Sequence, residues 1–558
     1  MALIAAAAAV AAFTVGIHWG TFAAGGSDSS CYLNQARLFA SGTTRIEQPL
    51  IVSAPWPRAE WTFTPAGHVP APVRRGAVVP MCPPGLPLLM AAARLLHISE
   101  FIVVPLLGAI AVWLTFVLGR RLDGAVTGAW SAGLVACSPI FLYQIVQPMT
   151  DVPAAAWWLL AVALAIPDEG THRVPPALAA GLATAMAILT RPNLLPLAIP
   201  IAIYLARLTP SPYGLPSPDD RSAPASPRSA FGEPRRSSRN EGASGGGKPS
   251  AKRPGAEHLA WFITGVAPGV VVLAILQWRM YGSPLSTGYG APRDLFRTSN
   301  IALNLARYPR WLLETHTPVL VVALAAPFVL RRRRAEAWLC LTIAIATIAA
   351  YLPYQVFNDW WYIRFLLPAI PLLVGLTVAT IHATVGRRAR GDCSATRTAA
   401  ISAGFAVAVF VLCAWWIHVA CERRAFELHD LERPYVDAGT FVAQRVSGAA
   451  AIVTVKDSGS VQYYAQRPTV SWDTLPPDAL DRTLDFLRSR GLTPLLLFET
   501  AEEPQFRARF EAASAIGGLD WPPMARVGRT VRVYDPADRA RYLEGATIQT
   551  IDIWPRRK

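Results

Sequence analysis

Two aspartates lie beside long apolar segments, where a charged side chain is energetically costly unless it is paired or functional. Asp28 follows the apolar run 3–24 in the stretch GGSDSS, and Asp151 precedes the run 152–166 in the stretch QPMTDVP. An ionisable residue at a membrane edge is costly, so carboxylates kept there are candidates for acid–base chemistry or for holding a cation. The alternative is structural, because an aspartate that opens a helix accepts backbone N–H groups and complements the helix dipole.

The composition is typical of a membrane protein. Of the 558 residues, 53% are hydrophobic and 16% are charged, whereas roughly 25% of the residues of a soluble chain are charged. A bilayer is spanned by about 20 apolar residues, and runs close to that length recur from Leu3 to Ala420 and then stop. We expect a polytopic α-helical membrane protein with about eleven transmembrane helices over residues 1–420 and a soluble tail over 421–558. The runs are 3–24, 101–118, 125–146, 152–166, 175–190, 194–206, 259–280, 318–330, 336–353, 365–384 and 398–420.

The charge distribution predicts the orientation. The net charge is +15, but residues 422–558 contain 19 basic and 19 acidic residues, so the surplus lies in the membrane half. Alternating the runs from an inner N-terminus puts 20 of the 33 basic residues before the tail on one side, which identifies that side as cytoplasmic and argues against a nucleic-acid surface. We therefore expect a multi-pass protein of the inner (plasma) membrane, with residues 25–97 as the first outer loop and an extracytoplasmic tail.

Two further segments have distinct compositions. Residues 209–258 are rich in Pro, Ser, Gly and Arg and poor in aromatics, which predicts a disordered cytoplasmic insertion. The tail alternates strand and helix patterns, so we expect a small α/β domain. Its predicted strands are 450–455, 495–498 and 529–534, and its predicted helices are 478–488 and 502–510. Lys456, Asp457 and Ser458 follow the first strand, where α/β sheets often bind ligands, although a helix cap explains them more simply.

The seven cysteines show no C-x-x-C spacing, so zinc-ribbon and redox-motif interpretations are dropped. Cys31 and Cys82 both fall in the first outer loop and could form a disulfide in an oxidising compartment. The alternative is that they are small buried hydrophobic residues.

Six motifs, in order, resemble those of the GT-C membrane glycosyltransferases, especially the branch of protein O-mannosyltransferases and lipid A aminoarabinose transferases. They span residues 1 to about 385 and are GGSDSSCYLNQARLFASG (25–42), PPGLPLLMAAARLL (83–96), QPMTDVPAAAWWLLA (147–161), ILTRPNLLPL (188–197), YGSPLSTGYG (281–290) and YIRFLLPAIPLL (362–373). The resemblance implies sugar transfer from a polyprenyl-phosphate donor to a cell-envelope glycan, lipid or protein at the outer membrane face, usually with inversion.

The resemblance also implies roles for both aspartates. Asp28 matches the proposed general base and Asp151 the second acid of the outer cavity. A base is needed because an acceptor hydroxyl is a poor nucleophile until its proton is drawn off. One departure is that Met81-Cys82 stands where the aminoarabinose transferases carry a charged pair before Pro-Pro, which puts a metal or lipid-phosphate contact from that position in doubt.

A phosphate leaving group calls for arginine, whose planar fork binds phosphate with two parallel hydrogen bonds. The candidates are Arg364, near the predicted outer end of its span, and Arg293, Arg297 or Arg307 in the loop after the seventh span. Arg364 could instead anchor its helix at the interface. Tyr32, Tyr289 and Tyr354 are candidates for donor or sugar binding, while an aromatic belt accounts equally well for the tyrosines near span ends.

No cofactor is enforced by the sequence, but a divalent metal is conceivable. The candidate ligands are Asp28 and Asp151 with the outward histidines His68 and His316. No spacing requires such a site, and ordinary loop histidines are the simpler interpretation.

A transporter or lipid flippase is the main rival, and a catalytically lapsed relative is a third alternative. A transporter predicts functional charges near mid-membrane and repeated halves with broken helices. The chain shows no internal repeat, and its acids lie at span ends on one side, which favours an enzyme.

The predicted orientation can be tested with alkaline phosphatase fusions, because this reporter folds only outside the cytoplasm. We expect activity from a fusion after Lys558 and none from a fusion within 209–258, since the basic loops hold the latter inside. The reverse pattern would overturn the orientation.

Overall fold

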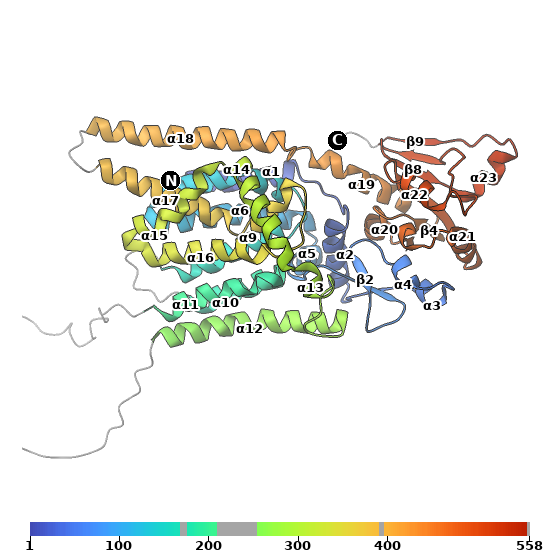
Figure 1. Ribbon diagram of the computed structural model, residues 1–558, viewed down its shortest axis with the longest axis horizontal. Coiled ribbons are helices and arrows are strands. Elements are labelled where there is room, and N and C mark those ends of the chain that lie inside the picture. The colour runs from blue at the N-terminus through green and yellow to red at the C-terminus, as the bar shows by residue number, and fades with distance from the viewer. Residues whose placement is uncertain (168–175, 209–253, 390–394, 555–558) are drawn as a thin grey trace, which may run out of the picture.

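The computed structural model describes residues 1–167, 176–208, 254–389 and 395–554. A bundle of long helices occupies one end of the molecule and a mixed sheet with short helices the other (Figure 1). We refer to the end of the bundle nearest the sheet as the sheet end. The segment between the first two long helices lies at this junction.

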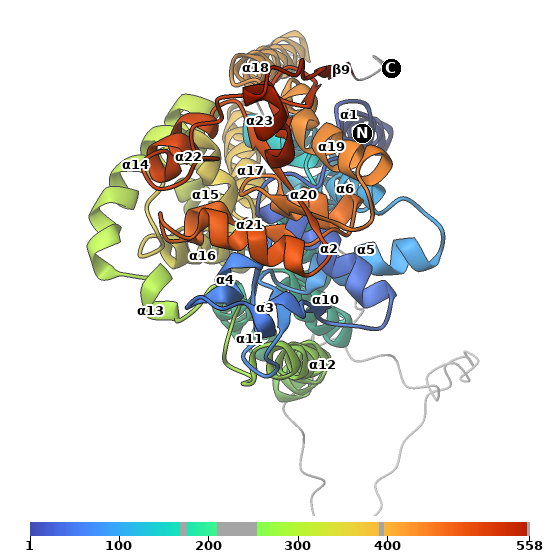
Figure 2. The same cartoon turned by 90° about the vertical axis from the view of Figure 1, so that its right-hand side faces the viewer.

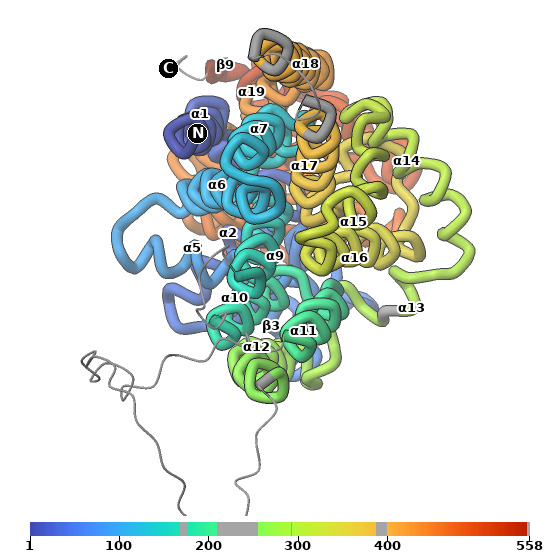
Figure 3. Tube along the Cα trace, turned by 90° about the vertical axis from the view of Figure 1, so that its left-hand side faces the viewer, coloured from blue at the N-terminus to red at the C-terminus, as the bar shows by residue number. Residues whose placement is uncertain are grey.

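Each of the eleven predicted apolar runs contains helix. Viewed along the bundle, these helices pack side by side around α6 and α9 (Figure 3). Their bounds are α1 (Ala2–His18), α6 (Val103–Asp123), α7 (Ala125–Ala136), α8 (Pro139–Ile145), α9 (Asp151–Ala165), α10 (Ala177–Thr190), η2 (Pro192–Leu197), α11 (Ala198–Ala206), α12 (Pro254–Tyr281), η5 (Pro318–Ala325), α15 (Ala326–Val329), α16 (Arg334–Tyr351), η7 (Trp360–Leu366), α17 (Ile370–Ala389) and α18 (Ala395–Glu422). Between them lie α13 (Pro292–Leu295), η4 (Thr298–Asn300), α14 (Ile301–His316) and η6 (Arg331–Arg333).

The number of membrane crossings stays a prediction. By length and composition, four described helices can cross a membrane, or seven if each of three bent pairs is one span. The bends are 62° between α7 and α8, 106° between α14 and η5, and 79° between η7 and α17. Pro139, Pro318 and Pro368 lie at these breaks, where proline removes a helical hydrogen bond and forces a kink. The runs 125–146 and 365–384 are therefore broken rather than continuous.

Glycine contacts bring the helices close together. A Cβ atom on Gly181 of α10 would lie 2.8 Å from the Cα of Gly265 in α12, and one on Gly119 of α6 would lie 2.8 Å from that of Gly128 in α7. Small residues at such crossings let two backbones touch, which compensates for the weak drive to associate in lipid. The contact at Gly181 fixes α12 against α10.

The predicted insertion 209–258 ends earlier than expected. Helix α12 begins at Pro254, so assigning residues 254–258 to the insertion is wrong. Proline is favoured in a first helical turn, and Glu257 in that turn complements the helix dipole. Residues 209–253 lie outside the described part of the chain.

The predicted first outer loop, 25–97, forms a compact layer at the sheet end. It contains a three-stranded antiparallel sheet of order β1-β3-β2. Its elements are α2 (Asp28–Ala40), β1 (Ile46–Glu47), α3 (Leu50–Ser53), α4 (Ala59–Thr62), β2 (His68–Pro70), β3 (Ala77–Pro80) and α5 (Gly85–Leu95), with η1 (Glu100–Ile102) after it. The disulfide Cys31–Cys82 joins α2 to the segment after β3, so of the two alternatives left open by the sequence, the structure has the disulfide.

The tail forms the predicted α/β unit around a six-stranded mixed sheet of order β5-β4-β6-β8-β7-β9. Its elements are α19 (Leu428–Arg445), β4 (Ala450–Val453), α20 (Ser458–Tyr464), β5 (Thr469–Val470), η8 (Trp472–Thr474), α21 (Leu480–Ser489), β6 (Thr493–Glu499), α22 (Glu503–Phe510), β7 (Ala525–Val527), β8 (Val531–Tyr534), α23 (Pro536–Leu543) and β9 (Ile551–Ile553). Strand β4 is parallel to β5 and β6, and β7 to β9.

The sheet unit rests on α2 and its loop (Figure 2). Asn34 Nδ2 donates to the Gly459 carbonyl at 3.1 Å, and Ser460 Oγ donates to the Ala24 carbonyl at 2.7 Å. The backbone N–H of Ser471 donates to the Thr62 carbonyl at 2.7 Å. These contacts flank Asp28 on both sides in sequence, so the tail fixes the helix that carries it.

Candidate functional site

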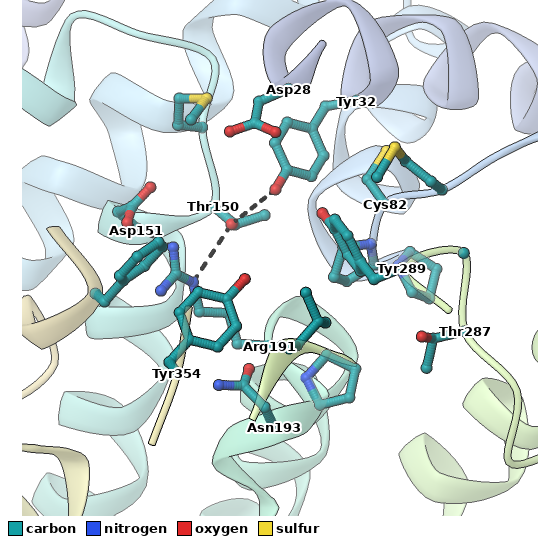
Figure 4. Close-up of a pocket in the computed structure, with 18 of the residues that line it drawn as sticks. Asp28, Tyr32, Cys82, Thr150, Asp151, Arg191, Asn193, Thr287, Tyr289 and Tyr354 are labelled. Atoms are coloured by element: carbon teal, nitrogen blue, oxygen red, sulfur yellow. Dashed lines mark hydrogen bonds and ion pairs between the residues drawn. The ribbon is translucent and has the colours of Figure 1, made fainter. Parts of the chain in front are cut away.

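A cavity of about 780 Å³ opens at the sheet end of the bundle. Its walls come from α2, the segment 81–84, the starts of α9 and η2, the end of α12, the segment 287–289, and the chain from the end of α16 through η7. Figure 4 shows Asp28, Tyr32, Asp151, Arg191 and Tyr354 around this space. Its volume falls in the range of roughly 300–1,000 Å³ typical of small-molecule sites.

Asp28 is paired with Arg364 across the cavity. The Asp28 Oδ2 accepts from Arg364 Nη2 at 2.9 Å, and the two side chains are 38% and 14% exposed. Asp28 is the first residue of α2, with Ser27 at the N-cap position, so the expected capping position is wrong by one residue. Arg364 is held in the cavity wall over the rings of Tyr362 and Phe365, 5.3 and 5.2 Å from their centroids.

Asp151 is paired with Arg191 in a more buried environment. The Asp151 Oδ1 accepts from Arg191 Nη2 at 2.5 Å, with side-chain exposures of 0% and 8%. Arg191 also donates through Nη1 to the Tyr351 hydroxyl at 2.9 Å and through Nε to Thr150 Oγ1 at 3.4 Å. The pair compensates both charges, but Asp151 Oδ2 is buried without a hydrogen-bond partner among the described residues, so the loss of either partner would leave an uncompensated buried charge.

Tyrosines surround the two ion pairs. The Tyr32 hydroxyl lies 3.1 Å from Thr150 Oγ1, which links α2 to the start of α9. Tyr289 and Tyr354 also line the cavity (Figure 4). Burial and, to a lesser extent, Asp28 raise the pKa of the Tyr32 phenol, and burial raises the pKa of Tyr289 well above its usual value. Both hydroxyls therefore stay neutral and can donate hydrogen bonds.

The lining charges balance. The charged residues that line the cavity are Asp28, Asp151, Arg191 and Arg364, two of each sign. The other polar lining side chains are neutral and include Asn193, Gln277 and Gln355, whereas Leu273 and Leu276 of α12 make one wall apolar. Such a site suits a ligand with hydroxyl groups, one anionic group and a hydrocarbon part.

Three candidate phosphate ligands are not part of the cavity wall. Arg293 is exposed in α13, and Arg297 is exposed just after it. Arg307 lies on α14, and its Nη1 donates to the carbonyl of Phe357, which fastens the segment before η7. All three predictions are wrong as to placement, because the sequence does not show in which direction a loop arginine points.

The possible metal site is not assembled. His68 is buried in β2 with Nδ1 3.1 Å from the Ala66 carbonyl, and burial lowers the pKa of its ring to about 4. In His316, Nε2 lies 2.8 Å from Ser138 Oγ, and Nδ1 lies 2.8 Å from Thr315 Oγ1. Neither histidine lines the cavity. In the described ranges, no three His, Cys, Asp or Glu residues are grouped to hold a metal ion.

The predicted turn after the first tail strand lies against α2 rather than in the cavity. Ser458 Oγ accepts from the Ala66 N–H at 2.9 Å and does not cap α20. Asp457 is buried, and burial together with Glu499 and Glu502 raises the pKa of its carboxyl well above the usual value. This turn therefore contributes to docking of the tail.

The disulfide is part of the cavity wall. Cys31 lies one turn after Asp28, and its partner Cys82 precedes Pro83 and Pro84, which line the cavity with it. The bond therefore fixes α2 relative to the opposite edge of the site.

Sequence reasoning missed Arg191. The available signal was an arginine placed between two apolar runs, in a predicted loop on the same side as Asp28 and Asp151. An arginine so close to the membrane needs a partner, and Asp151 is that partner in the structure.

Breaking the buried pair should destabilise the protein. We expect Arg191→Met to lower the free energy of unfolding by about 3–5 kcal/mol, because it leaves the Asp151 charge buried without compensation. The double variant Arg191→Met/Asp151→Asn should recover much of that loss, measured by unfolding in detergent. Arg310→Met is the control, since its pair with Glu314 is exposed and should change stability by about 0–1 kcal/mol. Equal losses in the single and double variants would contradict this role for the pair.

Known proteins share the overall fold of this chain. Residues 83–210 match the family model described as dolichyl-phosphate-mannose-protein mannosyltransferase. The structure of ArnT from Cupriavidus metallidurans in the apo state superposes with a TM-score of 0.54 at 14% identity over 95% of this chain and 97% of that chain. ArnT from the same organism bound to undecaprenyl phosphate gives a TM-score of 0.52 at 14% identity over the same shares. No curated protein matches the chain in sequence. The chain thus has the fold of ArnT, and the resemblance to GT-C membrane glycosyltransferases predicted from its motifs is confirmed.

Proposed function

We propose that this protein is an integral membrane glycosyltransferase. It transfers a sugar from a polyprenyl-phosphate donor to a glycan, lipid or protein of the cell envelope, at the outer face of the plasma membrane. The observation that carries the proposal is the cavity in which Asp28 and Arg364 face the same space at 2.9 Å. One supplies a base for an acceptor hydroxyl, and the other supplies a cation for a leaving phosphate.

The ligand chemistry follows from the walls of the site. The apolar residues Leu273 and Leu276 on α12 suit a hydrocarbon chain, whereas Asn193, Gln277 and Gln355 suit sugar hydroxyls. The structural relative ArnT was solved bound to undecaprenyl phosphate, which supports a polyprenyl phosphate as the carrier. Tyr32, Tyr289 and Tyr354 would position the sugar by stacking and by hydrogen bonds from their hydroxyls.

The reaction is a single displacement at the anomeric carbon. The acceptor oxygen attacks this carbon from the side opposite the phosphate, and its proton passes to Asp28. The bond between the anomeric carbon and the phosphate oxygen breaks, and its electron pair stays on the phosphate, beside Arg364. The products are the glycosylated acceptor, with inverted configuration, and the polyprenyl phosphate.

Asp151 would act indirectly at the far side of the cavity. Its Oδ1 is held by Arg191, and its Oδ2 is buried with no hydrogen-bond partner among the described residues. This oxygen could accept a hydrogen bond from the acceptor or, with a bound water, contribute to a cation site. The proposed displacement uses Asp28 and Arg364 and requires no divalent metal.

The proposal is tested by transfer of label from a panel of radiolabelled polyprenyl-phosphate sugars to envelope extract. We expect the purified wild type to transfer label from at least one donor, and Asp28→Asn to lower the rate by about 10²–10⁴-fold, the usual contribution of a general base. The asparagine has the same shape, so folding should be preserved.

Glu60→Gln is a matched control, because it removes a carboxylate from the same outer layer but does not line the cavity. Near wild-type transfer by Asp28→Asn would refute its role as base. A folded wild type that transfers no label from any donor would refute glycosyl transfer and favour a transporter, a flippase or a lapsed enzyme.

A further inference from the structure

The two ion pairs of the cavity differ in how firmly they are held. Arg191 contacts Asp151, Thr150 and Tyr351 and is almost completely buried. Among the described residues, Arg364 is hydrogen-bonded to one carboxylate, that of Asp28, whose side chain is 38% exposed. An ion pair with one exposed partner gains little free energy from its contact. The Asp28–Arg364 pair is therefore the one that a ligand can open.

Arg364, which lines the cavity, has N–H groups that Asp28 does not engage. Its guanidinium carries five N–H groups, and Nη2 is the nitrogen engaged by Asp28. Its Nε is buried and has no hydrogen-bond partner among the described residues. Two aromatic rings hold the guanidinium plane. A phosphate would take two parallel N–H groups of such a fixed fork.

A phosphate cannot bind Arg364 while the Asp28 carboxylate keeps its present position. Both anions would lie within hydrogen-bond reach of one guanidinium, and two negative charges at that separation repel each other strongly in a partly buried site. The Asp28 carboxylate can turn away, because its side chain reaches open space, whereas Arg364 is packed.

We propose that Asp28 and the donor phosphate compete for Arg364, so that binding of the donor releases the Asp28 carboxylate to accept the proton of the acceptor hydroxyl. This inference rests on the proposed function and adds an order of events to it. Without donor, the base is engaged by Arg364. With donor, Arg364 stabilises the leaving phosphate, and Asp28 is free. After transfer, the polyprenyl phosphate leaves, Asp28 loses its proton to water, and its carboxylate pairs with Arg364 again.

The test measures binding of undecaprenyl phosphate, which carries no sugar and needs no acceptor. If Asp28 competes for Arg364, then Asp28→Asn should bind this lipid more tightly than wild type, by about tenfold if the contact contributes about 1.4 kcal/mol. Arg364→Gln should bind it at least tenfold more weakly. In the Arg364→Gln background, Asp28→Asn should produce no further tightening, because the contested group is gone.

The double variant separates competition from general electrostatics. Removal of any nearby negative charge favours an anion, but that effect persists when Arg364 is absent. Asp359→Asn is the matched control, because Asp359 is an exposed carboxylate just before η7 and does not line the cavity. It should change affinity less than twofold. Asp28→Ala is a second variant in case Asn at this position disturbs α2, and it should also tighten binding.

Unchanged or weaker lipid binding by folded Asp28→Asn and Asp28→Ala would overturn the proposal, as would equal tightening with and without Arg364. These outcomes are distinguishable from failure of glycosyl transfer, since binding is measured without reaction. A protein that shows the competition but transfers no sugar refutes only the proposed function, and active wild type without the competition refutes only the inference.

Discussion

The ion pair between Asp28 and Arg364 is the constraint on which the rest of the site depends. Arg364 is only 14% exposed in the cavity wall, so its charge requires an anionic partner, and Asp28 supplies one. The two residues are 336 positions apart, and they meet because α2 lies across the sheet end while η7 bends by 79° from α17. Because of the break at Pro368, η7 leaves the direction of α17, and Arg364 on η7 reaches the cavity.

The tail matters to this pair although it lines no part of the cavity. Its turn 457–460 is hydrogen-bonded to both sides of Asp28, at Ala24 and at Asn34. The disulfide Cys31–Cys82 adds a covalent link one turn into α2. These links restrain α2 at both ends of its first turns. If the ion pair opens as proposed, we expect rotation of the Asp28 side chain rather than movement of the helix, because it is the smaller and faster rearrangement.

Features that depend on a local sequence pattern, such as the positions of the helices, were predicted. Features that depend on the path of a loop, such as the direction of its arginine side chains, were missed. Apolar runs revealed where helices lie, and six predicted site residues line one cavity: Asp28, Tyr32, Asp151, Tyr289, Tyr354 and Arg364. Arg293 and Arg307 were misplaced because the path of a loop over the surface has no periodic signal. The predicted strand 529–534 corresponds to β8, whereas β7, its hairpin partner across the turn at Gly528, was not predicted.

Charge balance explains why the two arginines cannot exchange roles. The cavity is neutral when both pairs are closed, and one phosphodiester adds a single negative charge. Placing that charge at Arg191 would expel Asp151, which is fully buried and has nowhere to be solvated. Placing it at Arg364 displaces Asp28, whose side chain reaches open space. The cheaper exchange is therefore at Arg364. In the proposed reaction, this asymmetry in burial, more than the identity of the residues, makes Asp28 rather than Asp151 available as the base.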